Sequence, residues 1–153
     1  MRVVTAQEAL DIFFKSVIGQ IRTDQGAKGI TASGRSSDSL AYGTDATGGQ
    51  LTGSNYFYWQ IVGRKPGKFA PPEAIEQWIR DKGITPEGRT TVKQLAFLIN
   101  RKMATKGTDI FIGKRSGLSF QEIVDKNISI LLGNIAQLKV KEFTTFLKAE
   151  LQK

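Results

Sequence analysis

The sequence predicts an α+β fold in which helices pack on a small antiparallel β-hairpin and a long helix forms the C-terminal part. Two patterns support this prediction. Apolar side chains recur every three or four residues in four separate stretches, which is the period of an amphipathic helix. One aromatic stretch between the first two alternates with the period of a strand. The 153 residues have the length of one domain, so we predict a single domain over residues 1–153.

The first helix is predicted over residues 6–25. Thr5 and Glu8 have the spacing of a capping box, in which each side chain bonds the main-chain N–H of the other residue. The apolar residues of its wide buried face are Ala9, Leu10, Phe13, Phe14, Val17, Ile18 and Ile21. Gly26 is expected to end this helix.

A long hairpin is predicted next. The segment Ser33–Ser39 is rich in serine and is expected to form a mobile loop or a weak edge strand. Residues 50–62 are predicted to form a strand, paired with one in the region 30–42. Its two faces would be Phe57, Trp59 and Ile61 on one side and Tyr56, Tyr58 and Gln60 on the other. An aromatic run can also stack on single-stranded bases, but the fully apolar first face favours a sheet packed on a helix.

A basic corner follows the aromatic stretch, and we call residues 63–71 the elbow. Pro66 within the elbow and Pro72 directly after it fix their φ angles, so the elbow loses little entropy when it becomes ordered. Three cations, Arg64, Lys65 and Lys68, lie on it. A phosphate-binding loop would need four residues between its glycines and a hydroxyl after the lysine. The elbow has three residues between Gly63 and Gly67 and a phenylalanine after Lys68, so docking against another surface is the better interpretation.

Three further helices complete the prediction. The first starts at Pro71 or Pro72, with Trp78 expected in the core, and ends at Gly83. The second starts with a capping box of Thr91 and Gln94 and ends at Gly107. The last starts near Ser119, and its apolar stripe is Phe120, Val124, Ile128, Leu131, Ile135 and Leu138. After Leu138 the apolar residues change to another side of the helix and are Phe143, Phe146, Leu147 and Leu151. This slip in helical phase predicts a bend near residues 139–141 or a second contact surface.

Composition excludes several classes of chemistry. The chain contains no cysteine and no histidine, so thiolate metal sites, disulfides and the usual catalytic nucleophile–histidine pairs are impossible. The 14 acidic residues are scattered along the chain, so we expect no metal, no cofactor and no enzymatic activity. No apolar run approaches the ~20 residues that span a bilayer, and the first residues lack a signal-peptide pattern. We therefore expect a protein that does not contact membranes.

The middle of the chain, from about Ala32 to Phe120, carries a series of short motifs in a fixed order. They are Ala32-Ser33-Gly34-Arg35, Gly49-Gln50-Leu51-Thr52-Gly53-Ser54, Tyr56-Phe57-Tyr58, Gly63-Arg64-Lys65-Pro66-Gly67-Lys68, Pro71-Pro72, Trp78-Ile79, Lys82-Gly83-Ile84, Arg101-Lys102-Met103 and Lys106-Gly107-Thr108. In this series the chain resembles the tail-completion and head–tail joining (neck) proteins of tailed bacteriophages. The polar segment Ser33–Ser39 and the long final helix depart from the family pattern.

The resemblance implies a structural virion protein that joins portal to tail and lines the DNA channel. It implies a ring of about six or twelve copies, in which one patch of each copy meets a different patch of the next. The other implied partners are the portal, neighbouring neck or tail proteins, and the passing genomic DNA, bound without sequence specificity. The protein would be assembled in the host cytoplasm and would reside in the virion. The candidate interface residues are Arg35, Tyr56, Tyr58, Arg64, Lys65, Pro66, Lys68, Phe69, Pro71, Lys114 and Arg115.

A basic nucleic-acid-binding module is the alternative. The formal charge is +8, and the basic residues cluster at Arg64–Lys68 and at Lys114 and Arg115. Binding through phosphate contacts would weaken steeply as the salt concentration rises. A solvated basic surface without a partner would also account for this charge.

Overall fold

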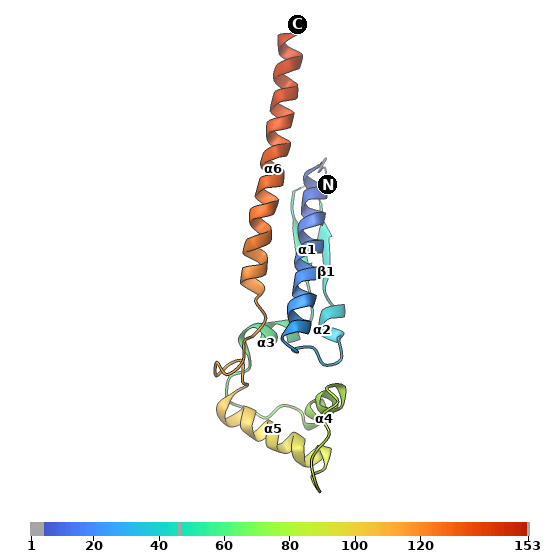
Figure 1. Cartoon of the computed structure of the whole chain (residues 1–153), viewed down its shortest axis with the longest axis vertical. Helices are drawn as coiled ribbons and strands as arrows, with labels where there is room; N and C mark the ends of the chain where they lie inside the picture. Colours follow the sequence, from blue (N-terminus) through green and yellow to red (C-terminus); the bar gives the residue numbers. More distant parts are fainter. Residues whose placement is uncertain (1–4, 46, 153) are drawn as a thin grey trace. The chain divides into compact units, whose positions relative to one another are not determined.

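A computed structural model describes residues 5–45 and 47–152 (Figure 1). The chain is mostly helical, with one two-stranded antiparallel hairpin and a long C-terminal helix that packs against the first helix. The predicted fold class is therefore confirmed. The elements are α1 (Ala6–Ala27), α2 (Arg35–Asp38), β1 (Ala41–Thr44), β2 (Gly49–Thr52), α3 (Tyr56–Val62), α4 (Pro72–Asp81), α5 (Val92–Lys106) and α6 (Phe120–Leu151).

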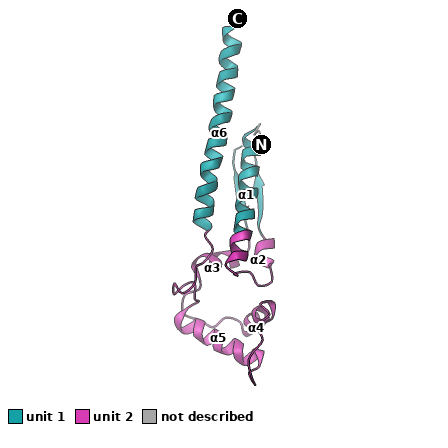
Figure 2. Ribbon diagram, viewed as in Figure 1, with its two compact units in different colours: residues 1–22, 40–52, 120–153 teal, residues 23–39, 53–119 magenta. Residues whose placement is uncertain are grey.

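The chain forms two compact units, coloured separately in Figure 2. Unit 1 comprises residues 1–22, 40–52 and 120–153, and unit 2 comprises residues 23–39 and 53–119. Each unit combines segments that are distant in the sequence, so the division marks no single boundary along the chain. The single domain over residues 1–153 stays a prediction.

In unit 1, α1 contacts the hairpin on one side and α6 on another. Phe14 of α1 stacks on Tyr42 of β1, with the ring centroids 5.6 Å apart. Thr44 of β1 donates its hydroxyl to Asp11 of α1 at 2.5 Å. Toward α6, Gln20 donates its amide to the buried Asn127 at 3.4 Å. The core of this unit is formed by Ala9, Phe14, Val17, Ile18, Ile21, Leu40, Ile123 and Leu138.

The hairpin is much shorter than predicted. Ala41 pairs with Thr52 and Thr44 with Gly49, and an Asp45 carboxylate accepts the N–H groups of Thr47 and Gly48 in the turn. The predicted strand over residues 50–62 is right for residues 50–52, which lie in β2, and wrong for Tyr56–Val62, which form the helix α3. The segment Ser33–Ser39 is neither a loop nor a strand throughout, since Arg35–Asp38 form the one-turn helix α2. The partner strand β1 begins one residue before the end of the predicted region 30–42.

In unit 2, α4 packs on α5. The capping box predicted for α5 is present, with Thr91 and Gln94 each bonding the N–H of the other. Pro72 opens α4 as predicted, and Gly83, with φ 65°, ends it by donating its N–H to the Arg80 carbonyl. Ile79 of α4 is fully buried, whereas Trp78, predicted in the core, is 37% exposed.

The start of α1 follows the predicted capping box, whereas the predicted end at Gly26 is wrong. Thr5 and Glu8 form the predicted reciprocal bonds at 3.1 and 3.2 Å. The helix continues through Gly26 to Ala27, and the chain turns out of it at Gly29, whose φ of 56° suits glycine. The N–H groups of Gly29 and Ile30 return to the carbonyls of Gly26 and Gln25, which is the bonding of a Schellman motif.

The close packing of Gly49 against Phe14 gives a test of unit 1. A Cβ at Gly49 would collide with the buried Phe14 ring, so we expect Gly49→Ala to destabilise the unit by about 1–3 kcal/mol, as overpacking does. Gly43→Ala is the matched control, because a Cβ at Gly43 in the same hairpin meets nothing within 4 Å. Urea unfolding followed by circular dichroism measures both variants. Equal stability of the two variants would contradict this packing.

Candidate docking surface on unit 2

The elbow is fixed by hydrogen bonds from its main chain to α5 and to the turn that follows α5. Arg64 donates its N–H to the Thr108 hydroxyl at 2.9 Å, and the Thr108 N–H returns to the Arg64 carbonyl at 2.9 Å. The N–H of Gly67 donates to the Ala104 carbonyl at 2.9 Å. The elbow is therefore a bonded structure rather than a free loop.

The buried side chain of Asn100 on α5 provides a further attachment. Its carboxamide accepts the Ala70 N–H at 2.8 Å and donates to the Ala70 carbonyl at 2.7 Å. Asn100 is only 2% exposed, so these two bonds satisfy a polar side chain that would otherwise be costly to bury. The main-chain groups of Ala70 are satisfied by the same pair of bonds.

Two glycines allow the close approach of these segments. Gly63 ends α3 at φ 70°, and a Cβ there would collide with the main chain of Phe111. Gly107 ends α5 at φ 84°, and a Cβ there would lie 2.8 Å from the Arg64 carbonyl oxygen. Both positions combine a left-handed φ with a lack of space, so no other residue suits them.

The outer side of the elbow carries the predicted cations and prolines. Lys65, Pro66, Lys68 and Pro71 are exposed, as the docking prediction requires. Arg64 differs, because its guanidinium donates to the Lys68 carbonyl at 2.5 Å and so helps to hold the turn. Beside them, Phe69 of the elbow and Phe97 of α5 lie with their ring centroids 6.2 Å apart, and both rings are about half exposed.

The helix α3, directly before the elbow, turns its apolar side chains outward. Tyr56, Tyr58, Trp59 and Val62 are each between 42% and 63% exposed, and we call these four residues the α3 face. At 100° per residue they occupy one continuous side of the helix. The predicted buried grouping of Phe57, Trp59 and Ile61 is therefore wrong for Trp59, because the chain is helical here and the period of two does not apply.

The single polar residue of α3, Gln60, points inward. Its side-chain oxygen accepts from the fully buried Gln25 at 2.6 Å and from the Ser36 hydroxyl at 3.2 Å. Ser37 donates its hydroxyl to the same Gln25 at 2.5 Å, and the Gln60 carbonyl accepts the Leu118 N–H at 2.8 Å. This network fixes the rotation of α3 and so fixes which side is exposed. Sequence reasoning missed it, and its only local signal was one glutamine within an apolar run.

The other predicted interface cations lie in a separate group. Arg35 donates to Ser33 and forms an ion pair of 3.6 Å with Asp81 at the end of α4. Arg115 donates to the Lys28 carbonyl, just after α1. Lys114 is exposed on the loop that precedes α6. Arg35 and Arg115 are thus held by their own chain, unlike Lys65 and Lys68.

Two lysines, like Arg115, donate to main-chain carbonyl groups of their own chain. Lys82 donates to the carbonyls of Gly29 and Thr31 at 2.5 and 2.7 Å. Burial and the nearby Arg115 charge lower the pKa of Lys82. Lys28 donates to the Gly117 carbonyl, the Ser119 hydroxyl and the Asp24 carboxylate. A substantial part of the positive charge is therefore used to hold the fold.

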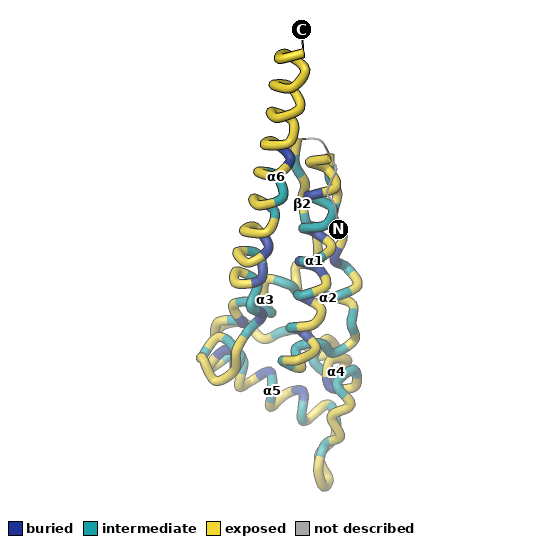
Figure 3. Tube along the Cα trace, turned by 45° about the horizontal axis from the view of Figure 1, so that its top comes forward, coloured by how far each residue is buried: buried dark blue, intermediate teal, exposed yellow. Residues whose placement is uncertain are grey.

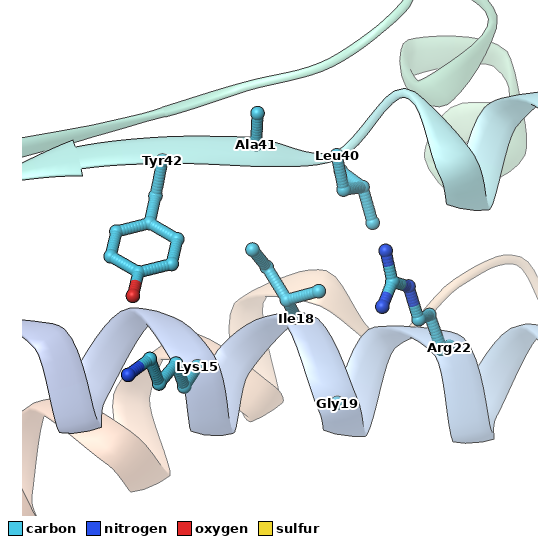
Figure 4. A pocket seen from close by; sticks show the side chains of 7 residues that line it. All are labelled: Lys15, Ile18, Gly19, Arg22, Leu40, Ala41 and Tyr42. Atoms are coloured by element: carbon cyan, nitrogen blue, oxygen red, sulfur yellow. The ribbon is translucent and has the colours of Figure 1, made fainter.

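Unit 1 contains a groove between α1 and β1 (Figure 4). Its volume is about 430 Å³, and its lining combines Lys15, Arg22 and Tyr42 with Ile18, Gly19, Leu40 and Ala41. The charged groups of this lining are both cations, so the groove favours an anionic group over a cation. It contains none of the predicted interface residues.

Within residues 5–45 and 47–152, no group of three acidic side chains is arranged to hold a metal ion. Over the same residues, no helix is both long and apolar enough to cross a membrane. Comparison with family models, with curated proteins and with solved structures found no match for this chain. The surface of unit 2 must therefore be interpreted from its own chemistry.

Replacing Asn100 tests the attachment of the elbow. Asn100→Leu keeps the branched outline of the side chain, in a larger volume, but leaves the Ala70 N–H and carbonyl without partners, so we expect a loss of about 2–3 kcal/mol in the free energy of unfolding. Both tryptophans, Trp59 and Trp78, lie in unit 2, so denaturation followed by tryptophan fluorescence reports on this unit. Asn55→Ala is the control, because the Asn55 side chain makes no capping bond. Unchanged stability of Asn100→Leu would show that the two bonds are dispensable.

Asp24 makes the stability of unit 2 vary with pH in the acid range. Burial raises its pKa, but bonds from the Ser119 N–H and from Lys28 outweigh burial, so the pKa lies below the ordinary 3.8. A carboxyl group whose pKa is lowered in the folded state stabilises the fold at pH values above its ordinary pKa. That stabilisation is lost as the pH falls from the ordinary pKa through the lowered one. We expect Asp24→Asn to unfold more easily at neutral pH and to show a flatter stability curve in acid. The exposed Asp38→Asn is the control, and parallel curves for Asp24→Asn and the unmodified protein would refute the role of Asp24.

Proposed function

We propose that this chain is a structural subunit of a tailed-phage particle, where copies form a closed ring between the portal and the tail. The observation that carries the proposal is the outward side of unit 2, which joins the α3 face to a rigid basic elbow. Exposed apolar patches rimmed by polar groups mark interaction sites in soluble proteins. The resemblance of the motif series to neck proteins supplies the kind of assembly.

The rigidity of the elbow supports docking. A surface that is already ordered loses little conformational entropy when it binds, so more of its contact energy contributes to affinity. Here the two prolines, the Asn100 bonds and the Thr108 bonds fix the main chain before any partner arrives. Lys65 and Lys68 would then meet an acidic patch on the next copy or on a neighbouring ring.

The proposal predicts about six or twelve copies per particle, because a closed ring requires a fixed count. Quantitative mass spectrometry of purified particles, referred to the major capsid protein, measures this number. Electron microscopy of the purified chain at high concentration should show closed rings. Absence of the chain from particles would refute the structural role.

Charge reversal on the elbow gives a sharper test. We expect Lys65→Glu with Lys68→Glu to fold normally and to fail in ring assembly, because both side chains are exposed and neither holds the elbow. Arg64 is unsuitable for this purpose, since its side chain bonds the elbow itself. The matched control is Arg89→Glu with Lys93→Glu, which makes the same charge change at exposed positions before and within α5. Normal assembly of the elbow variant would remove the elbow from the interface.

Nucleic-acid binding remains the second candidate, and Lys65, Lys68 and Lys114 are the exposed cations that favour it. Arg115, Lys28 and Lys82 contribute less to it, because their side chains bond carbonyl groups of the chain. Binding to duplex DNA through phosphates would fall with salt at a slope near −0.9 for each contact. Binding that is absent or independent of salt would eliminate this candidate.

A further inference from the structure

The end of α6 is an uncovered helix with a strongly apolar side. We call residues 139–151 the α6 tail. Its residues are all exposed, as the upper part of Figure 3 shows, although α6 continues through them without the predicted bend. The large apolar side chains of the tail, which are between 42% and 85% exposed, are Val140, Phe143, Phe146, Leu147 and Leu151.

This apolar side is distinct from the side of α6 that packs in unit 1. The buried residues of α6 are Ile123, Asn127 and Leu138. At 100° per residue, Val140, Phe143, Leu147 and Leu151 fall roughly on the opposite side of the helix. The slip of phase seen in the sequence therefore corresponds to a second, exposed apolar side of α6, and its role as a contact surface stays a prediction.

The tail has too little support of its own. Most helical stability in proteins comes from packing of an apolar face, and the tail, although continuous with the packed part of α6, has no such packing of its own. A contiguous row of exposed large side chains is also unusual on a soluble chain without a partner. The tail is thus best explained as half of an interface.

We propose that the α6 tail of one copy packs on the α3 face of a neighbouring copy. Both surfaces are apolar and carry aromatic rings, and such rings gain from edge-to-face and offset contacts. An aromatic side chain has ~150–250 Å² of surface and an aliphatic one less; scaled by their exposed fractions, the nine side chains of the two surfaces together offer on the order of 1,000 Å². That area is about the lower limit of a specific protein interface.

Pairing between two tails explains the observations less well. The positions that suit a coiled-coil seam are Ala136, Val140, Phe143 and Leu147, and the next seam position is Glu150. The seam would extend over two heptads only, and it would leave the α3 face uncovered. A contact between the α6 tail and the α3 face covers both surfaces of each copy with one type of interface.

Such a contact is heterologous, because two different patches of the same chain meet. Heterologous contacts form rings when the rotation between copies closes. This inference rests on the proposed function, because it names the two patches through which the proposed ring would close.

The absence of cysteine makes cross-linking a direct test. Two single variants are prepared, Tyr58→Cys on the α3 face and Leu147→Cys on the α6 tail, and are mixed with a short bismaleimide at ring-forming concentration. Both positions are exposed, so we expect both variants to fold. We expect a covalent heterodimer of the two variants, and we expect it to disappear when Tyr58→Cys is replaced by Thr90→Cys, an exposed position before α5.

Two outcomes would overturn the inference. A homodimer formed by Leu147→Cys alone, without the heterodimer, would assign the α6 tail to tail–tail pairing. No cross-link in any mixture would mean that neither surface meets another copy. Electron microscopy of the same samples separates this failure from that of the proposed function, because rings without the heterodimer leave the ring assembly standing and remove only this pair of patches.

Discussion

The surface of unit 2 depends on one constraint, which is the bonding of the elbow's main chain to α5 and to the turn after it. The buried Asn100 bonds both main-chain groups of Ala70, and Thr108 exchanges two bonds with Arg64. The elbow connects α3 to α4, so these bonds also fix where α3 ends and where α4 begins. Without them the segment would retain its prolines and its charge but would lose the geometry that makes it a surface.

Signals that act within one turn of helix were readable from the sequence. The capping boxes at Thr5 and Thr91, the proline that opens α4 and the glycines that end α4 and α5 all act on neighbouring residues. The aromatic residues Tyr56–Val62 were misread, because their β propensity and alternation are local. The bond that orients their helix joins Gln60 to Gln25, a residue 35 positions away. A short apolar run is ambiguous until such a contact is known.

The candidate site could be predicted in part. Sequence reasoning identified Lys65 and Lys68, because the elbow is a continuous segment whose prolines and glycines already define a turn. It also grouped Arg64, Arg35 and Arg115 with them, although Arg64 and Arg115 bond carbonyl oxygens and Arg35 pairs with Asp81. The acceptors are main-chain oxygens, present at every residue, so no sequence pattern marks which of them will bind a cation.

The way in which the elbow is held has a consequence for how its specificity can change. Its attachments are main-chain bonds and the close approach of Gly63 and Gly107, whereas the side chains of Lys65 and Lys68 make no part of that framework. Substitutions at these two positions would alter the charge offered to a partner without altering the conformation of the chain. The charge that this corner offers to a partner can therefore be changed while the backbone is retained, so recognition here is separable from folding.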